Sequence, residues 1–418
     1  MRLLMLGNNN CSEEMLDYAK SQGIYTIATD FLMPETSRTK LKADEYWMVD
    51  TSDIDTLEQK CRKHSIDAVI CGISEFNQDM VLELTKRLNL PCYCTEEAWS
   101  YSRDKDKLKK LCREIGISVP EEYFLSEDPS EEELADLKYP VVVKPVDMCS
   151  NRGVSFCNNS KEVTEAVHFI RSISANTKIL VEKKMQGKEF MALYVLAEGK
   201  AALLNVYVSY HQSEEPAFCY SVNTTAHQNF DQYIEEIDEK AKELMEKMGC
   251  TDGICWLELI LNEDKHFYVL EAGYRLPGDM IFLPLKKVYG FDSVKWMVDF
   301  ACGKKHSAKK LPEIYEKKHK NHAVSYMMWT NRSGQIAEVA GLEKIEELPC
   351  KLVAKSAEIG DKIEAYRPLY TIVFESEDED KICELIEEIN ENVHVKNTEG
   401  EDMLIYFTDF SILKNRNK

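Results

Sequence analysis

Long apolar runs and paired cysteines are both missing from this sequence. No stretch approaches the roughly 20 apolar residues that cross a bilayer, and the apolar start is soon interrupted by Asn8-Asn9-Asn10, too early for a signal peptide. The 14 cysteines are scattered singly, apart from Cys92-Tyr93-Cys94. This scattered pattern is typical of reduced thiols and not of a disulfide scaffold or a zinc site. We therefore expect a cytoplasmic protein with no membrane contact.

Positive charge is also scarce. The chain has 52 Lys and Arg against 73 Asp and Glu, a formal net charge of -21. A nucleic acid would be repelled by such a chain, whereas a small phosphorylated molecule would meet only the local lysines and arginines. At 418 residues, 44% hydrophobic and 30% charged, the chain predicts an ordinary globular protein of about two to four domains.

The first 95 or so residues alternate short apolar runs with amphipathic stretches. This order predicts an open parallel sheet, with strands and helices at Arg2–Leu6, Ser12–Gln22, Tyr25–Thr29, Ile54–His64, Ala68–Cys71, Phe76–Leu88 and Cys92–Cys94. The first loop has only Gly7, too few glycines for a pyrophosphate, so we interpret residues 1–97 as Rossmann-like without a dinucleotide. Polar residues at the strand ends, Asn8–Asn10 and Ser74–Asn77, either face a ligand or cap helices, and capping is the more common role.

A lysine closes the strand predicted after Tyr139-Pro140. Lys144 is followed by a loop of small residues, Asp147–Gly153, and a second strand at Val154–Phe156. Backbone N–H groups exposed at Gly153 and the point charge of Lys144 would suit a phosphate, although this is not a P-loop. An ordinary surface lysine is the alternative. Upstream, Ala98–Ile115 predicts one lysine-rich helix that ends at Gly116.

Gly253–Met280 carries the strongest chemical signal. Two apolar runs, Ile254–Leu261 and His266–Leu270, flank a polar turn, which predicts a hairpin. Glu258 and Glu271 interrupt its apolar pattern, and two carboxylates on adjacent buried strands suit a hard cation. The alternative is a solvent-facing edge hairpin, with Arg275 as the salt-bridge partner of both glutamates.

These features occur in an order that resembles the ATP-grasp superfamily, of the carboxylate–amine ligase type seen in the L-amino-acid ligase and biotin-carboxylase-like branches. The motifs that carry the resemblance are Arg103-Asp104-Lys105, Tyr139–Pro145, Ser150–Val154, Val181–Met185 with Gly187-Lys188-Glu189, and Glu258 with Glu271–Arg275. The resemblance implies an α/β and α+β fold in three parts. These are the leading domain at 1–97, an ATP-grasp domain at 98–305 with a small clamping subdomain at about 120–188, and a small α+β domain at 306–418.

The resemblance also implies roles for single residues, all in binding ATP with Mg²⁺, or Mn²⁺ as a substitute. Lys105 and Lys144 would contact phosphates, and Ser150, Asn151, Arg152, Gly153 and Val154 would close over them. Glu182, Lys183, Lys184 and Met185 would frame the adenine, and Glu189 would accept from the ribose. Glu258 and Glu271 would hold the metal, and Arg275 would stabilise the transferred phosphoryl group or anchor a substrate carboxylate, with Lys144 assisting catalysis.

The activity implied is formation of an acyl phosphate from a small-molecule carboxylate, followed by attack of an amine. Gly273 departs from the asparagine that many relatives have, which leaves a second metal less well held. Alternatives are a decayed nucleotide-binding regulator and an enzyme that acts on formate or carbamate. A homodimer is compatible with the sequence. His211, Tyr220, His227 and Arg367 could line the substrate pocket or be ordinary packing and surface residues.

Overall fold

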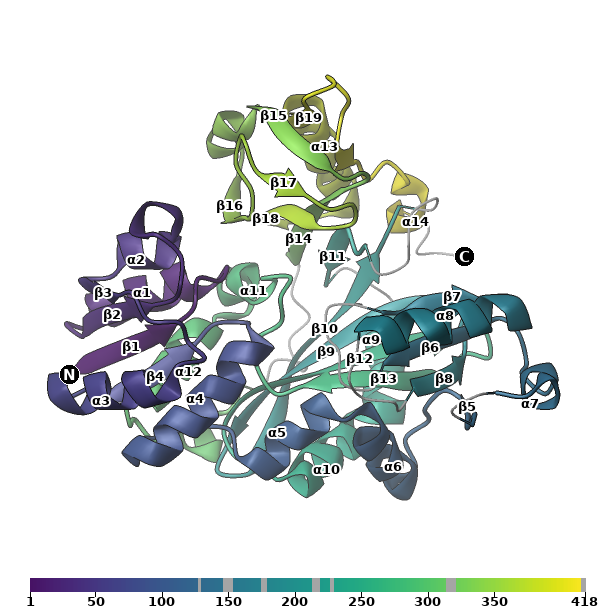
Figure 1. Cartoon of the computed structure of the whole chain (residues 1–418), viewed down its shortest axis with the longest axis horizontal. Coiled ribbons are helices and arrows are strands. Elements are labelled where there is room, and N and C mark those ends of the chain that lie inside the picture. The colour runs from purple at the N-terminus through teal and green to yellow at the C-terminus, as the bar shows by residue number, and fades with distance from the viewer. Residues whose placement is uncertain are drawn as a thin grey trace.

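Four β-sheets organise the part of the chain that the computed structural model describes, residues 1–126, 129–145, 153–173, 179–212, 219–225, 229–312 and 321–414. Figure 1 shows the N-terminal sheet at one side, a small subdomain at the other and the C-terminal strands above the central sheet. Within these ranges, none of the helices has the length and apolar character needed to span a bilayer.

The N-terminal sheet is parallel, with the strand order β3-β2-β1-β4. Its elements are β1 (Arg2–Leu6), α1 (Ser12–Ser21), β2 (Tyr25–Thr29), α2 (Arg38–Lys42), β3 (Glu45–Trp47), α3 (Ile54–His64), β4 (Ala68–Cys71) and α4 (Glu75–Leu88). Parallel strands covered on both faces explain why β1 and β4 are almost wholly apolar. The Rossmann-like prediction is confirmed.

One local prediction in this region is wrong, and one strand was not predicted. Cys92–Cys94 is not a strand; instead the Tyr93 hydroxyl donates to the carbonyl of Tyr274, 3.1 Å away, which ties the segment to the central domain. The edge strand β3 was not predicted, because Glu45 and Tyr46 are partly exposed and give no apolar run.

The helix predicted at Ala98–Ile115 is two helices, α5 (Glu96–Arg103) and α6 (Lys105–Ile115). Asp104 separates them in an extended conformation (φ -120°, ψ 97°), and its side chain accepts from the backbone N–H of Lys107 as the N-cap of α6. Because α6 therefore begins at Lys105, its first turn delivers this lysine to the site.

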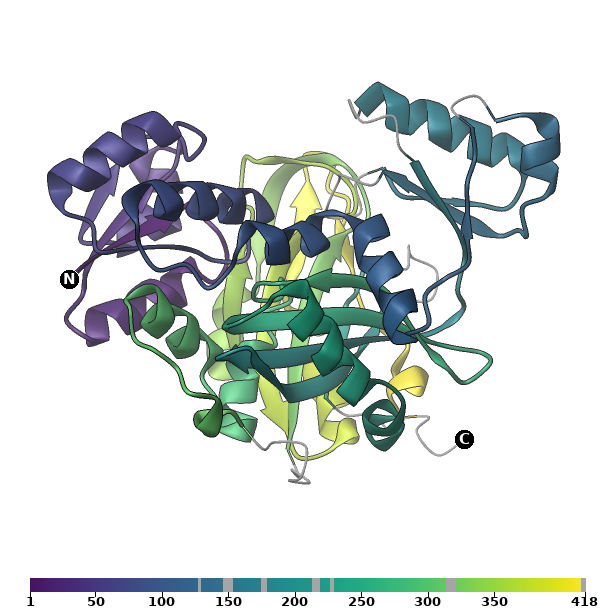
Figure 2. The ribbon, with the colours of Figure 1, turned by 90° about the horizontal axis from the view of Figure 1, so that it is seen from below.

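The small subdomain has its own sheet, in the antiparallel order β5-β8-β6-β7, and its own apolar core. Its elements are β5 (Glu122–Tyr123), α7 (Glu131–Ala135), β6 (Val141–Pro145), β7 (Ser155–Cys157), α8 (Ser160–Ile173) and β8 (Ile179–Lys183). Figure 2 shows it as a separate lobe, on the same side of the central sheet as the N-terminal sheet. A lobe with an independent core can cover a ligand without disturbing the rest of the fold.

The central sheet has nine strands and runs into the C-terminal part without a break, in the order β13-β12-β9-β10-β11-β14-β18-β16, with β20 on β14. Its strands are β9 (Gly187–Ala197), β10 (Lys200–Tyr210), β11 (Val222–Thr224), β12 (Gly253–Asn262), β13 (Phe267–Gly273), β14 (His322–Thr330), β16 (Cys350–Lys355), β18 (Pro368–Ser376) and β20 (Leu404–Ile405). The predicted hairpin is β12 and β13, with β12 covered on its other edge by β9.

Helices and a three-stranded sheet complete the fold. The helices are α9 (Phe230–Tyr233), a π-helical stretch (Ile234–Asp238), α10 (Glu239–Met248), α11 (Phe282–Tyr289), α12 (Ser293–Ala301), α13 (Glu379–Asn392) and α14 (Phe410–Lys414). The small sheet has the order β17-β15-β19, from Lys362–Ile363, Gly334–Ala340 and His394–Asn397.

Candidate active site

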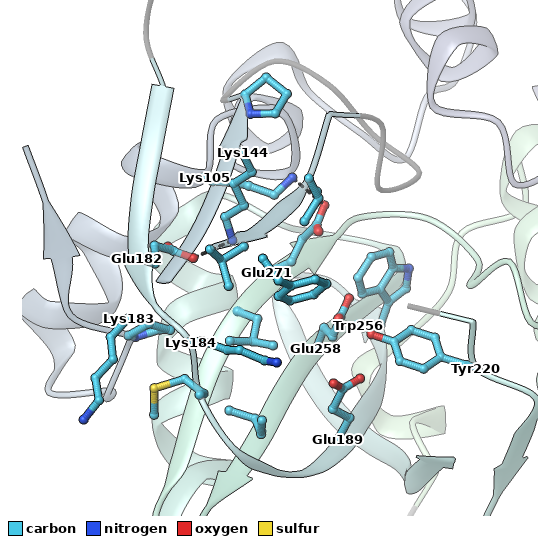
Figure 3. Close-up of a pocket in the computed structure, with 18 of the residues that line it drawn as sticks. Lys105, Lys144, Glu182, Lys183, Lys184, Glu189, Tyr220, Trp256, Glu258 and Glu271 are labelled. Carbon is cyan, nitrogen blue, oxygen red and sulfur yellow. Dashed lines mark hydrogen bonds and ion pairs between the residues drawn. The ribbon is translucent and has the colours of Figure 1, made fainter. Parts of the chain in front are cut away.

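A cavity of about 270 Å³ lies between the small subdomain and the β12–β13 hairpin (Figure 3). It brings together most of the residues singled out in the sequence. Those that line it are Lys105, Lys144, Val154, Glu182, Lys183, Lys184, Met185, Glu189, Glu258, Glu271 and Arg275. We call the side formed by β6 and β8 the hinge end and the side formed by β12 and β13 the hairpin end.

At the hairpin end, Glu258 and Glu271 are directly opposite each other on paired strands. The Tyr220 hydroxyl donates to Glu258 Oε1 at 2.9 Å, and Lys105 Nζ lies 3.3 Å from Glu271 Oε1. Burial and the neighbouring Glu271 raise the pKa of Glu258 above its ordinary value. Because β12 is an inner strand and both carboxylates line the cavity, the solvent-facing alternative does not describe this hairpin.

Arg275 is held by groups from two domains. One of its terminal nitrogens (Nη2) lies 2.7 Å from Glu75 Oε1, and the other (Nη1) donates to the carbonyl of Leu276 at 2.9 Å. Although burial opposes the charge on Glu75, Arg275 and Arg103 lower the pKa of its carboxyl group. Glu75 opens α4, so the N-terminal domain contributes directly to the cavity. Ser74 just before it caps α4, as expected for this polar cluster.

Lys105 is surrounded by carboxylates. Burial works against its charge, yet Glu271, Glu75 and Glu258 together raise the pKa of Lys105 above its ordinary value. This lysine therefore stays protonated and neutralises part of the negative charge at the hairpin end.

At the hinge end, charges are paired within the protein. Lys144 Nζ lies 2.6 Å from Glu182 Oε2, and the fully buried Lys109 forms an ion pair with the other oxygen of Glu182. Lys109 also lies 3.8 Å from Glu122, which pairs with Arg113. Burial, with Lys105 nearby, lowers the pKa of Lys144 to about 8. Helix α6 thus contacts the small subdomain through ion pairs, in which Lys109 and Arg113 face Glu182 and Glu122.

Glu189 lies near the hairpin end, close to Glu258 and Tyr220 (Figure 3). Its Oε2 is buried and has no hydrogen-bond partner among the described residues. Burial and the charge of Glu258 raise the pKa of Glu189 to about 8. A buried carboxyl oxygen that lacks a donor suits a ligand hydroxyl group, in keeping with the predicted ribose contact.

The predicted phosphate loop is described only in part. Ser150, Asn151 and Arg152 lie outside the described residues. Gly153 has a positive φ of 80°, and a Cβ there would lie 3.1 Å from the ring of Pro145, so glycine suits this turn. Val154 lines the cavity next to it.

Gly273 has a packing reason that the sequence did not reveal. It pairs with Trp256 across the hairpin, and a Cβ at Gly273 would lie 2.1 Å from the Trp256 indole. Real Cβ atoms do not approach so closely, so an asparagine here would require the indole to move. Trp256 in turn packs against Arg275, whose Cζ lies 5.1 Å from the ring centroid.

Sequence reasoning missed the site roles of Lys109 and Trp256, and left those of Glu75 and Tyr220 undecided. Lys109 follows Lys105 by one helical turn, so helical periodicity could have placed it on the inward face of α6 with Leu108 and Cys112. Trp256 precedes Glu258 by two residues and so shares its face of β12.

The sequence also offered His211, His227 and Arg367 as residues that could line the substrate pocket. His211 lines a neighbouring pocket, Arg367 is exposed, and His227 lies outside the described residues.

The hairpin end suits a magnesium ion that takes only part of its ligands from the protein. Among the described residues, no group of three or more His, Cys, Asp or Glu side chains could hold a metal. Mg²⁺ usually binds through one or two carboxylates, keeping waters and the phosphates of its partner as the remaining ligands. Glu258 and Glu271, which lie opposite each other, supply such a pair.

Comparison with known proteins agrees with this geometry. The family model described as ATP-grasp domain matches residues 137–282, which include β6, the hinge and the hairpin. The chain carries an ATP-grasp domain. The resemblance drawn from the motifs is thus confirmed, and the three-part α/β and α+β fold with it.

Relatives of the chain include several enzymes. The formate-dependent phosphoribosylglycinamide formyltransferase of Methanococcus maripaludis is 23% identical over 277 residues, 63% of this chain and 67% of that protein. The L-amino acid ligase of Bacillus licheniformis superposes with a TM-score of 0.78 at 19% identity, covering 95% of this chain and 98% of that one.

A second similar structure is the biotin carboxylase domain of the Hydrogenobacter thermophilus 2-oxoglutarate carboxylase, solved with MgADP and bicarbonate. Its TM-score is 0.77 at 14% identity, covering 100% of this chain and 94% of that one. At these identities the likeness is one of fold.

Proposed function

We propose that this ATP-grasp chain is an ATP-dependent ligase that joins a carboxylate to an amine. The observation that carries the proposal is the hairpin end of the cavity. There, opposed Glu258 and Glu271 lie beside Lys105, and Arg275 lines the same cavity. Phosphoryl transfer between two anions needs charge neutralisation and positioning more than a nucleophilic side chain, and this arrangement offers both.

In the proposed reaction a carboxylate oxygen takes the γ-phosphoryl group of ATP and ADP leaves. The amine then bonds to the acyl carbon, phosphate leaves with the electron pair of the broken C–O bond, and the nitrogen loses a proton. Mg²⁺ bound by Glu258 and Glu271 would neutralise the phosphate oxygens. Lys105 and Lys144 would bind phosphates, Glu182 to Met185 would frame the adenine, and Arg275 would bind the anion that reacts.

The small subdomain would close this site. Its β6 and β8 carry Lys144 and the hinge, and the lobe has its own core. A closed lobe excludes water that would otherwise hydrolyse an acyl phosphate. The domain boundaries at 97 and 305, cytoplasmic localisation and a homodimer are also part of this proposal.

The test is ADP and phosphate release by the purified chain with MgATP, across pairs of L-amino acids and other acids with amines. We expect release that depends on both substrates, together with a product whose mass is that of acid plus amine less water. Tight ATP binding without turnover for any pair would instead favour a nucleotide-binding regulator.

A formate-using enzyme is the second candidate, because the curated relative named above is formate-dependent. Formate would then replace the larger acid as the phosphoryl acceptor. Formate-dependent ADP release with no response to amino acids would select this alternative, and a formylated product would identify it.

A further inference from the structure

The indole N–H of Trp256 is a buried donor without a hydrogen-bond partner in the described part of the chain. Trp256 is 5% exposed and lines the cavity. The other four tryptophans each donate to an acceptor within the protein: Trp47 to Glu45, Trp99 to Asp79, Trp296 to Leu196 and Trp329 to Tyr220. Because an indole N–H can only donate, leaving it unpaired inside a protein is costly unless a ligand accepts from it.

The carboxylates nearest to Trp256 along the hairpin and in the cavity already have donors. Glu258 accepts from Tyr220, Glu271 is paired with Lys105, and Glu75 is paired with Arg275. Figure 3 shows the indole beside Tyr220 and Glu258, with no interaction drawn to its nitrogen. The indole N–H group therefore has no acceptor among these three carboxylates.

A second unpaired donor lies next to the first. Nε of Arg275 is buried and has no hydrogen-bond partner among the described residues, although both terminal nitrogens of the same group are engaged. The guanidinium lies 5.1 Å from the centroid of the Trp256 ring. Gly273 leaves the space that the indole needs to lie there. A neutral and a cationic N–H donor, on two neighbouring residues that line the same cavity, suit an anion with two oxygens.

We propose that Trp256 Nε1 and Arg275 Nε bind the carboxylate of the acid substrate and, after phosphoryl transfer, its acyl oxygen. This inference rests on the proposed function, which supplies the acid. Trp256 is then a binding residue that determines which acids fit, because its indole forms one wall of the compartment next to Gly273. A neutral donor also holds the carboxylate without removing the negative charge that the reacting oxygen needs.

A binding experiment tests the inference without turnover. The full-length chain is labelled with ¹⁵N at the tryptophan indoles, and the signal of Trp256 is assigned by its loss in Trp256→Phe. L-amino acids and formate are then added in turn to the complex with MgADP. We expect the Trp256 signal alone to shift downfield, while that of Trp296, which has an internal acceptor, stays in place.

The outcomes separate the inference from the proposed function. A shift without any ADP release in the turnover assay would keep the carboxylate site and reject the ligase. A Trp256 signal that stays in place with every acid would overturn the inference, whether or not ADP is released.

Kinetics supply the second arm. Trp256→Phe removes the N–H donor together with the five-membered ring but keeps an aromatic side chain, so the KM for the acid should rise about tenfold, as for one hydrogen bond to a charged group. The KM for MgATP should not change. Trp296→Phe is the matched control and should leave both constants as they are. A purely structural role of Trp256 would instead lower Tm with no selective change in the KM for the acid, and that result would also overturn the inference.

Discussion

The two ends of the cavity handle charge in opposite ways. At the hinge end, Glu182 sits between Lys144 and Lys109, so the charges neutralise one another inside the protein. At the hairpin end, Glu189 and Glu258 have raised pKa values, and Lys105 lies beside Glu271. The hinge end is complete as it stands, whereas the hairpin end is short of positive charge. The difference supports the proposal of a bound cation at the hairpin end.

Replacing one metal carboxylate should produce the largest effect. In Glu271→Ala we expect Mg²⁺-dependent ADP formation to fall about 1,000-fold or more, since several kcal/mol of charge stabilisation is lost. ADP release is measured alongside Tm, which should change little because Glu271 faces the cavity. Glu263→Ala, at the exposed turn of the same hairpin, is the control. Activity that survived in Glu271→Ala would show that the metal assignment is wrong.

The opposite response is expected at the hinge end. Lys109→Met leaves Glu182 and Glu122 with fewer partners in a buried place, which should lower the free energy of unfolding by about 3–5 kcal/mol. Urea unfolding measures this loss. The Mg²⁺ concentration for half-maximal ADP release should not move, and a clear rise would mean that the two ends are not independent.

Arg275 links the hairpin end to the N-terminal domain through Glu75. We expect Arg275→Lys to lower kcat about 100-fold, because a positioned donor to the reacting anion is lost, and Glu75→Gln to lower it about tenfold. The double variant should be no worse than Arg275→Lys, since the effects of residues that act together do not add. Glu83→Gln on the same helix α4 pairs only at the surface and is the control. Additive losses would refute a positioning role for Glu75.

A methyl group at Gly273 probes the packing behind the hairpin. Its Cβ would lie 2.1 Å from the Trp256 indole, so Gly273→Ala should destabilise the fold by about 1–3 kcal/mol through overpacking. Thermal unfolding gives the loss. Combining it with Trp256→Ala, which vacates the space, should remove most of that increment, and an undiminished penalty would mean that the indole is not the obstacle.

The free energy of unfolding should also depend on pH differently at the two ends of the cavity. This is the smallest of the expected effects. Glu189 has an ordinary pKa of 4.5 and a folded pKa of about 8, so its contribution is present at low pH and is lost as pH rises through 8. Lys144, lowered from 10.5 to about 8, works the other way and gains as pH rises from 8 to 10.5.

Glu189→Gln without nucleotide should therefore raise Tm at pH 8 by roughly 2 °C or more relative to the parent, with little change near pH 4.5. Lys144→Met, which also takes a partner from Glu182, should lose the gain in stability on the alkaline side. Parallel pH profiles for the parent and Glu189→Gln would show that Glu189 is not protonated in the fold.

Sequence predicted the parts of this molecule where local pattern and function coincide. Alternating apolar runs gave the parallel N-terminal sheet, and Glu258 and Glu271 were visible because they break an apolar pattern on paired strands. Contacts between distant segments were not accessible in this way. The pairing of Glu75 with Arg275 joins residues 200 positions apart, and nothing near either one announces it.

The local sequence was also misleading at two positions where a single residue determines the structure. Asp104 reads as another charged residue of a long helix, yet its side chain caps α6 and splits the helix in two. Gly273 was visible only as a missing asparagine, because the indole that fills the space comes from the opposite strand. Position in space, and not residue type, determined each of these roles.

The contact between Gly273 and Trp256 also constrains how this hairpin can change over evolutionary time. A lineage that acquired asparagine at 273 first would have to displace the indole, whereas one that first replaced Trp256 with a smaller residue would have the room. The two substitutions are thus open in one order and obstructed in the other. To gain a second metal ligand at position 273 by the open order, the protein would first have to lose the indole N–H of Trp256.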